Sequence, residues 1–216
     1  MSLATAAVYR NNIVVAYIKA KDFENAIEVA SLALRCHRAF QVNILSQDSC
    51  KNDASDITLD HYMLQSDMCE RSEKQGARTM YTYESGIRLP PSVTDTAIIA
   101  PILIFNAALA FHLFAERQYE APSSRVRLLE KAKRMYELAF RAQQCTDENM
   151  LFEFAILNNV AVIEHKIGDK AEANKYFEYL LSVLMMFVDQ GCHLRLRHLQ
   201  GFLLNIPPLI KAAKAA

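Results

Sequence analysis

Three asparagines stand at matching places in a pattern that the chain repeats, and their side-chain amides are its best candidates for recognition chemistry. Asn12 and Asn159 are each followed fourteen residues later by an alanine, and Asn106 precedes its matching alanine by twenty-six residues. An amide both donates and accepts hydrogen bonds, so it suits a peptide backbone. Two interpretations of these asparagines stay open. They contact a ligand, or they bond carbonyls or neighbouring helices inside the protein, as buried amides must.

The residues after each asparagine predict the second helix of a helical hairpin. Small or aromatic residues recur there at spacings of four and then three, which marks one face of a helix. They are Ala26, Ala30 and Ala33 in the first copy, Ala132, Tyr136 and Ala139 in the second, and Ala173, Phe177 and Leu180 in the third. One hairpin cannot bury its own face, so copies must stack. The sequence therefore predicts an all-α fold of antiparallel helix-hairpin repeats, with a C-terminal capping helix within residues 192–206.

An insertion at residues 41–95 separates the first hairpin from the second. The polar stretches 46–56 and 66–78 indicate exposed chain. Residues 80–90 alternate between apolar and polar types, which predicts a short β segment, and residues 41–45 are its candidate neighbour. Thr94, Asp95 and Thr96 each offer a side chain that can cap a following helix, which runs through residues 101–115. We expect a single domain over residues 1–216, and the sequence leaves open whether the insertion covers the binding face.

Two segments, IVVAYIKAKDFENAIEVASLAL and VAVIEHKIGDKAEANKYFEYLL, resemble the tetratricopeptide repeat. The matching residues are Tyr17, Phe23, Ala26 and Ala33 in the first copy, Ala132, Tyr136 and Ala139 in the second, and Gly168, Ala173 and Phe177 in the third. The chain also resembles a tetratricopeptide-like family of diatom-type algae for which no activity is known. The resemblance implies a right-handed solenoid of three repeats. Its first helices would line a concave face, with Asn12, Asn106 and Asn159 facing an extended peptide. Asn11 and Asn158 would lie beside the first and the third of them.

Histidines and lysines near the ends of the same helices extend this predicted binding face. His112 and His165 each come six residues after the repeated asparagine, and Lys19 and Lys166 lie one residue further along their helices. Together they would make the face mildly basic, which suits an acidic peptide. The alternative for the histidines is ordinary partly exposed positions on helices.

Composition and motifs exclude several other functions. The 24 basic and 24 acidic residues balance, which argues against nucleic acid as a partner. Catalytic and phosphate-binding motifs are missing, as is a metal-ligand spacing, so we expect no enzyme activity, cofactor or metal. Residues 98–115 carry no formal charge and approach the length of a membrane span, but Pro101, Asn106 and His112 interrupt them. A buried core helix is the better interpretation, and no membrane partner is expected.

Five scattered cysteines without a CxxC pair, and an N-terminal stretch without the apolar region of a signal peptide, indicate a cytoplasmic protein with reduced thiols. The sequence as a whole predicts a scaffold that binds a protein or an extended peptide. The alternatives are a structural or oligomerising helical domain and, less favoured, a small-molecule-binding or enzymatic protein.

Overall fold

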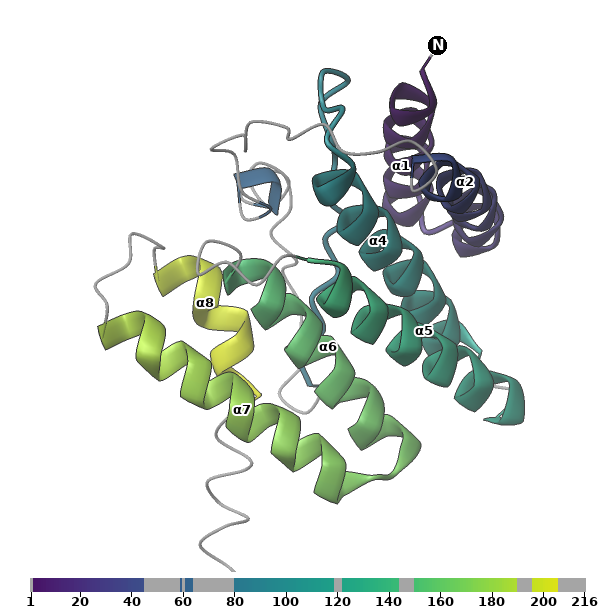
Figure 1. The fold of residues 1–216 in the computed structure, drawn as a ribbon. Coiled ribbons are helices and arrows are strands. Elements are labelled where there is room, and N and C mark those ends of the chain that lie inside the picture. Colours follow the sequence, from purple (N-terminus) through teal and green to yellow (C-terminus); the bar gives the residue numbers. More distant parts are fainter. Residues whose placement is uncertain are drawn as a thin grey trace, which may run out of the picture. The chain divides into compact units, whose positions relative to one another are not determined.

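The computed structural model describes residues 2–44, 59, 61–63, 80–118, 122–143, 150–189 and 196–205. Within these ranges the chain forms α-helices joined by turns and extended segments, and no β-strand is present (Figure 1). The all-α prediction is therefore confirmed. The chain divides into two compact units, one of Met1–Glu70 with Ser85–Met150 and the other of Arg71–Glu84 with Leu151–Ala216. The backbone passes from the second unit into the first between Glu84 and Ser85.

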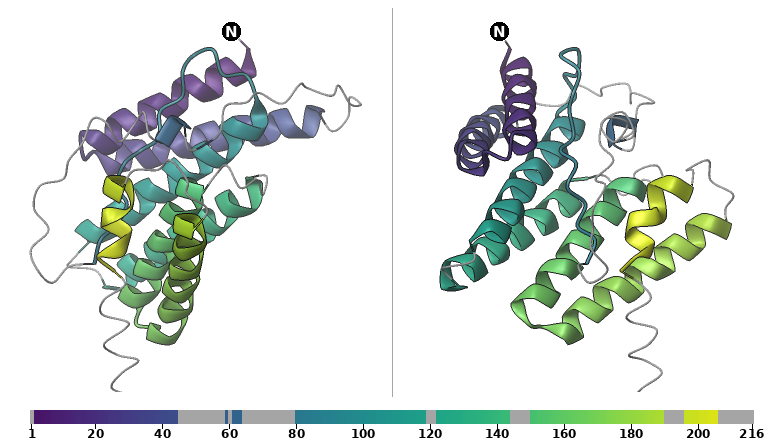
Figure 2. Two further views of the ribbon diagram at one scale, coloured as in Figure 1. Left: turned by 90° about the vertical axis from the view of Figure 1, so that its left-hand side faces the viewer. Right: turned by 180° about the vertical axis from the view of Figure 1, so that it is seen from behind.

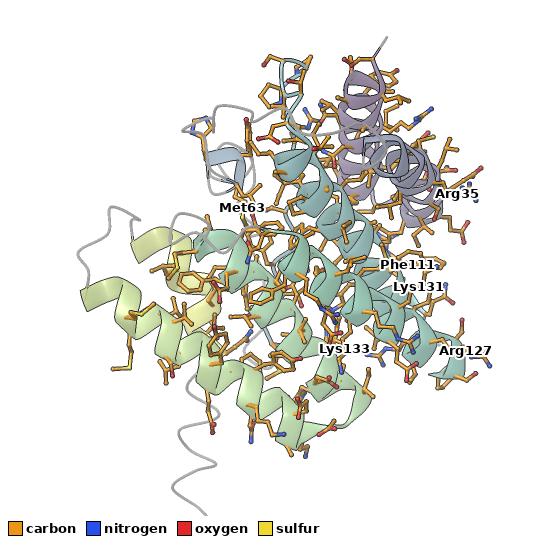
Figure 3. The ribbon with its side chains drawn as sticks, in the orientation of Figure 1. Arg35, Met63, Phe111, Arg127, Lys131 and Lys133 are labelled. Atoms are coloured by element: carbon orange, nitrogen blue, oxygen red, sulfur yellow. The ribbon has the colours of Figure 1, made fainter. Side chains whose placement is uncertain are left out.

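The first unit contains four long helices: α1 (Leu3–Lys19), α2 (Phe23–Ile44), α4 (Thr96–Arg117) and α5 (Pro122–Ala142). Helix α1 packs against α2 and α4 packs against α5, while α4 also contacts both α1 and α2. Helix α4 is thus the central element of this unit. Where α5 crosses α4, the Lys131 Nζ lies 4.1 Å from the centre of the Phe111 ring (Figure 3).

Helix α4 forms the core of the first unit because it is apolar on all sides. Every residue from Ile98 to Leu113 is buried. The helix is long and apolar enough to cross a membrane by length and composition, and its burial within the unit is that of a core helix. The Asp95 side chain caps it by accepting a hydrogen bond from the Ala97 N–H at 2.8 Å, as predicted.

The second unit contains α6 (Met150–Ile167), α7 (Lys170–Asp189) and α8 (Leu196–Leu203). The Tyr179 hydroxyl on α7 donates a 3.2 Å hydrogen bond to Glu153 on α6. Across both units, all nine residues predicted to form the inner faces of second helices are buried. These faces were identified from sequence spacing alone.

The turns α1–α2 and α6–α7 share one geometry, at equivalent places in the repeated pattern. Lys21 and Gly168 both have positive φ, 59° and 106°, just past the ends of their helices. The next residue caps the second helix in each case. Asp22 accepts from the Asn25 N–H at 3.4 Å, and Asp169 accepts from the Glu172 N–H at 3.0 Å.

The prediction of a short β segment is wrong for the described residues. Residues 41–44, the proposed neighbouring strand, are the end of α2, and residues 80–90 join no strand. The stretches 46–56 and 66–78, and residue 45, lie outside the described residues. Between them, residues 59 and 61–63 are helical, and the side chain of Met63 is fully buried (Figure 3).

Candidate functional site

The backbone of residues 81–89 is bonded by asparagine side chains from α1, α4 and α6 and from the turn after α8. This segment runs toward α4 without forming a helix (Figure 2). Its bonded residues are Tyr81, Tyr83, Ile87 and Leu89. In an extended chain, every second residue presents its N–H and its C=O on the same edge. Within each unit, the asparagines therefore contact one edge of the segment's backbone.

In the first unit, Asn12 on α1 and Asn106 on α4 each bond both backbone groups of one residue. The Asn12 amide donates to the Leu89 C=O at 2.7 Å and accepts from the Leu89 N–H at 3.0 Å. The Asn106 amide donates to the Ile87 C=O at 2.8 Å and accepts from the Ile87 N–H at 2.9 Å. Each amide thus takes the place that a peptide group of a neighbouring strand would occupy in a sheet.

Asn11 completes this cluster, which we call the first clamp (Asn11, Asn12 and Asn106). Its amide nitrogen donates to the Ile87 C=O at 3.0 Å, and its oxygen accepts from Asn106 at 2.8 Å. The Ile87 carbonyl therefore accepts two hydrogen bonds, one from each of two fully buried asparagines. No polar atom of the Asn106 amide is left without a partner in a core that excludes water.

The second unit holds a cluster with the same arrangement, the second clamp (Asn158, Asn159 and Asn205). Asn159 on α6 donates to the Tyr83 C=O at 2.9 Å and accepts from the Tyr83 N–H at 2.8 Å. Asn205, just past α8, donates to the Tyr81 C=O at 2.7 Å and accepts from the Tyr81 N–H at 2.7 Å.

Asn158 plays the part in the second clamp that Asn11 plays in the first. It donates to the Tyr81 C=O at 3.0 Å, and its oxygen accepts from Asn205 at 2.7 Å. The two clamps therefore share one hydrogen-bond pattern, built from an Asn-Asn pair on the first helix of a hairpin and one asparagine from a later helical element. Each clamp holds two residues of the segment that are two positions apart.

The side chains of the segment are packed as well as its backbone. Tyr83, Ile87 and Leu89 are at most 2% exposed. In the second unit, the Tyr83 ring stacks on Phe202 with centroids 6.1 Å apart, and the Tyr81 ring meets the edge of Phe202 at 5.6 Å. Backbone hydrogen bonds and apolar side-chain contacts thus both bind the segment to the helices.

Two glycines allow the close approach of backbone and side chain within each unit. A Cβ on Gly201 of α8 would overlap the Tyr81 ring. A Cβ on Gly86 would lie 3.2 Å from both γ carbons of Val15 on α1, tighter than most real contacts. A side chain at Gly201 would therefore require the Tyr81 ring to move, and one at Gly86 would require Val15 to shift slightly.

The structure brings Asn12, Asn106 and Asn159 onto one segment of the chain's own insertion. The sequence left two alternatives for these amides, a partner's backbone or internal carbonyls, and the structure shows backbone bonds made within the chain. The insertion therefore does reach the asparagines. Asn205 was not among the sequence candidates. The available signal was an apolar run ending in asparagine, which Asn106 and Asn158 share with it.

The other candidate residues lie in varied surroundings. His112 is fully buried in the first unit, its ring centroid 6.1 Å from that of Tyr136 and its Nε2 3.8 Å from Glu116. His165 and Lys19 are exposed, and Lys166 is half-buried. Among the described residues, no group of three or more His, Cys, Asp or Glu side chains could hold a metal ion. A role for these two histidines and two lysines in binding a partner remains a prediction.

Comparison with protein families, with curated proteins and with solved structures finds no match for this chain. The two asparagine clamps are therefore the basis for assigning a function.

Proposed function

We propose that this protein is a helical-repeat scaffold that binds an extended polypeptide through asparagines that contact its backbone. Residues 81–89 are the resident ligand, and a partner's extended segment is the alternative one. The observation that carries the proposal is that Asn12, Asn106, Asn159 and Asn205 each bond both the N–H and the C=O of one residue. Such contacts recognise an extended backbone whatever its side chains, which is the logic of β-strand addition.

The tetratricopeptide-like arrangement is part of this proposal. It is supported by the shared turn geometry of α1–α2 and α6–α7, and by the matching positions of the two Asn-Asn pairs in these hairpins. It is also supported by the burial of all nine inner-face residues. Stacked hairpins present their first helices side by side, so an asparagine on each can bond successive parts of one extended ligand.

A second candidate function is a closed structural domain in which the segment only completes the fold. The occupied clamps favour it, because every polar atom of Asn106 and Asn159 is already bonded within the chain. The two functions differ in one measurable respect. A scaffold accepts an equivalent segment supplied from outside, and a closed domain does not.

The test uses a variant in which residues 81–89 are replaced by a Gly/Ser sequence of equal length that has proline at positions 81, 83, 87 and 89, which we call the emptied variant. Proline has no N–H to donate to the asparagine oxygens, so the replacement segment cannot make these four hydrogen bonds. A fluorescent peptide of residues 80–90 is titrated into it, and binding is followed by anisotropy. We expect saturable binding and a rise in Tm, because ligand that binds only the folded state stabilises it. Absence of binding to the folded emptied variant contradicts the scaffold and favours the closed domain.

N-methylated peptides show whether the backbone edge is what the clamps bind. Methylation at Tyr83 and Ile87 removes two donors that the clamps accept, and we expect affinity to fall at least about tenfold. Methylation at Ser85 is the matched control. Within the described residues, none of the six asparagines bonds Ser85, so affinity should change little. Equal losses from both peptides would contradict recognition of one edge.

A further inference from the structure

We propose that the partner segment has aromatic residues at positions i and i+2, glycine at i+5, and aliphatic residues at i+6 and i+8. This inference rests on the proposed function, because it assumes that a foreign segment takes the place of residues 81–89. It adds side-chain selectivity to a backbone contact that by itself accepts most sequences. The two halves of the motif are determined separately, one in each unit.

The aromatic half follows from α8. Phe202 is fully buried and meets both tyrosines, stacking on Tyr83 with an interplanar angle of 14° and meeting Tyr81 at 89°. These are two favourable geometries of aromatic pairs. Gly201 adds the space that the Tyr81 ring fills, since a Cβ there would overlap it. The second clamp therefore selects two aromatic residues that are two positions apart.

The aliphatic half follows from α1. The γ carbons of Val15 come so close to Gly86 that a Cβ on the segment would lie 3.2 Å from them. The next residue, Ile87, is fully buried, and Leu89 is 1% exposed. The first clamp therefore selects glycine immediately before a buried aliphatic residue, with a second aliphatic residue two positions later.

The remaining positions differ in burial. The side chains of Glu84 at i+3 and Arg88 at i+7 are exposed, whereas Thr82 at i+1 is 6% exposed and limits the size of the residue there. Proline is excluded at the four bonded positions because it has no N–H to donate. The partner is thus an extended segment without proline at those positions, with apolar residues two positions apart on either side of one glycine.

The test is a positional scan of the 80–90 peptide against the emptied variant. We expect Tyr83→Leu and Gly86→Ala each to weaken binding by about tenfold, from the lost ring contact and the contact with Val15. Ser85→Ala is the matched control and should stay within about twofold. If all three peptides bind equally well, the motif is overturned while the scaffold stands. If the unchanged peptide does not bind, the proposed function fails with it.

A second measurement does not require the emptied variant to fold. In the otherwise unchanged chain, Gly201→Ala should lower the Tm because its Cβ displaces the Tyr81 ring. In a Tyr81→Ala background the same substitution should lower the Tm much less, because the ring is gone. A smaller effect in the Tyr81→Ala background would show that Gly201 and the Tyr81 ring interact directly. Equal effects of Gly201→Ala in both backgrounds would contradict aromatic selection by α8.

Discussion

Asn159 bonds both backbone groups of Tyr83, accepting from its N–H at 2.8 Å and donating to its C=O at 2.9 Å. Both residues are nearly free of solvent, at 0% and 2% exposure. The Asn159 side chain therefore makes the two backbone hydrogen bonds to Tyr83 that a neighbouring strand would make in a sheet. The same relationship recurs between Asn12 and Leu89 in the other unit.

Removing the Asn159 amide should destabilise the protein strongly. Asn159→Ala removes the two hydrogen bonds that the N–H and C=O of Tyr83 make to this buried amide, and we expect the free energy of unfolding to fall by about 3 kcal/mol. Urea denaturation measures this change. Asn174→Ala on α7, a half-buried asparagine outside the clamps, is the control and should change it by less than about 0.5 kcal/mol. Similar losses in both variants would mean that the clamp bonds contribute little.

In the first clamp, the loss of stability on replacing an asparagine should be larger for the more deeply buried one. Asn106 is fully buried, whereas Asn12 is half-buried, so water can replace the Asn12 amide more readily. We expect Asn106→Ala to cost at least about 1 kcal/mol more than Asn12→Ala, by thermal or urea unfolding. The opposite order would show that the hydrogen bonds from Asn106 to Ile87 stabilise the protein less than those from Asn12 to Leu89 do.

Gly86 and Val15 should show coupled effects. Gly86→Ala alone places a methyl group against the Val15 side chain and should destabilise the protein by about 1–3 kcal/mol. Val15→Ala makes space for that methyl group, but by itself it destabilises the protein because it removes buried packing contacts. The double variant should then be more stable than the sum of the single effects predicts. Additive effects would contradict a close approach of the segment to α1.

Glu153 should give the second unit a pH-dependent stability. Burial raises the pKa of this carboxyl above its ordinary value of 4.5, an effect partly opposed by the hydrogen bond from Tyr179. The folded state therefore holds the proton more tightly than the unfolded chain does. Glu153 contributes most at low pH, and stability should fall as pH rises from 4.5 through the raised pKa.

Glu153→Gln removes this titration while leaving other carboxyl groups in place. The measured quantity is the free energy of unfolding of the wild type minus that of Glu153→Gln, between about pH 4 and about pH 7. We expect this difference to decrease as pH rises. A constant or increasing difference would show that burial does not raise the pKa of Glu153.

The resident segment should hinder binding of a free peptide to the unchanged chain. A covalently attached ligand acts at an effective concentration of about 1 mM or more, so a free peptide competes poorly. We expect the 80–90 peptide to bind the wild type at least about a hundredfold more weakly than the emptied variant. Equal affinities would indicate that the peptide binds outside the clamps.

The sequence predicted the helices and their inner faces, and it named five of the six clamp asparagines, because the helical period and the repeated pattern are both local features of the sequence. It also indicated an extended conformation for residues 80–90 from their alternation. It could not show what the edge of that segment bonds. Alternation reports which side chains are buried, and an asparagine can replace a strand without leaving any periodic signal. His112 shows the same limit, since its spacing from Asn106 matches that of His165 from Asn159, yet only His112 is buried.

The measurement that tests the account most directly is residue-resolved amide hydrogen exchange in the unchanged protein. The account predicts slow exchange for the N–H groups of Tyr81, Tyr83, Ile87 and Leu89, and fast exchange for Ser85 between the clamps. It also predicts that Asn159→Ala releases the Tyr83 N–H. Fast exchange at all five residues, or a Tyr83 N–H unaffected by Asn159→Ala in a folded protein, would contradict the clamp.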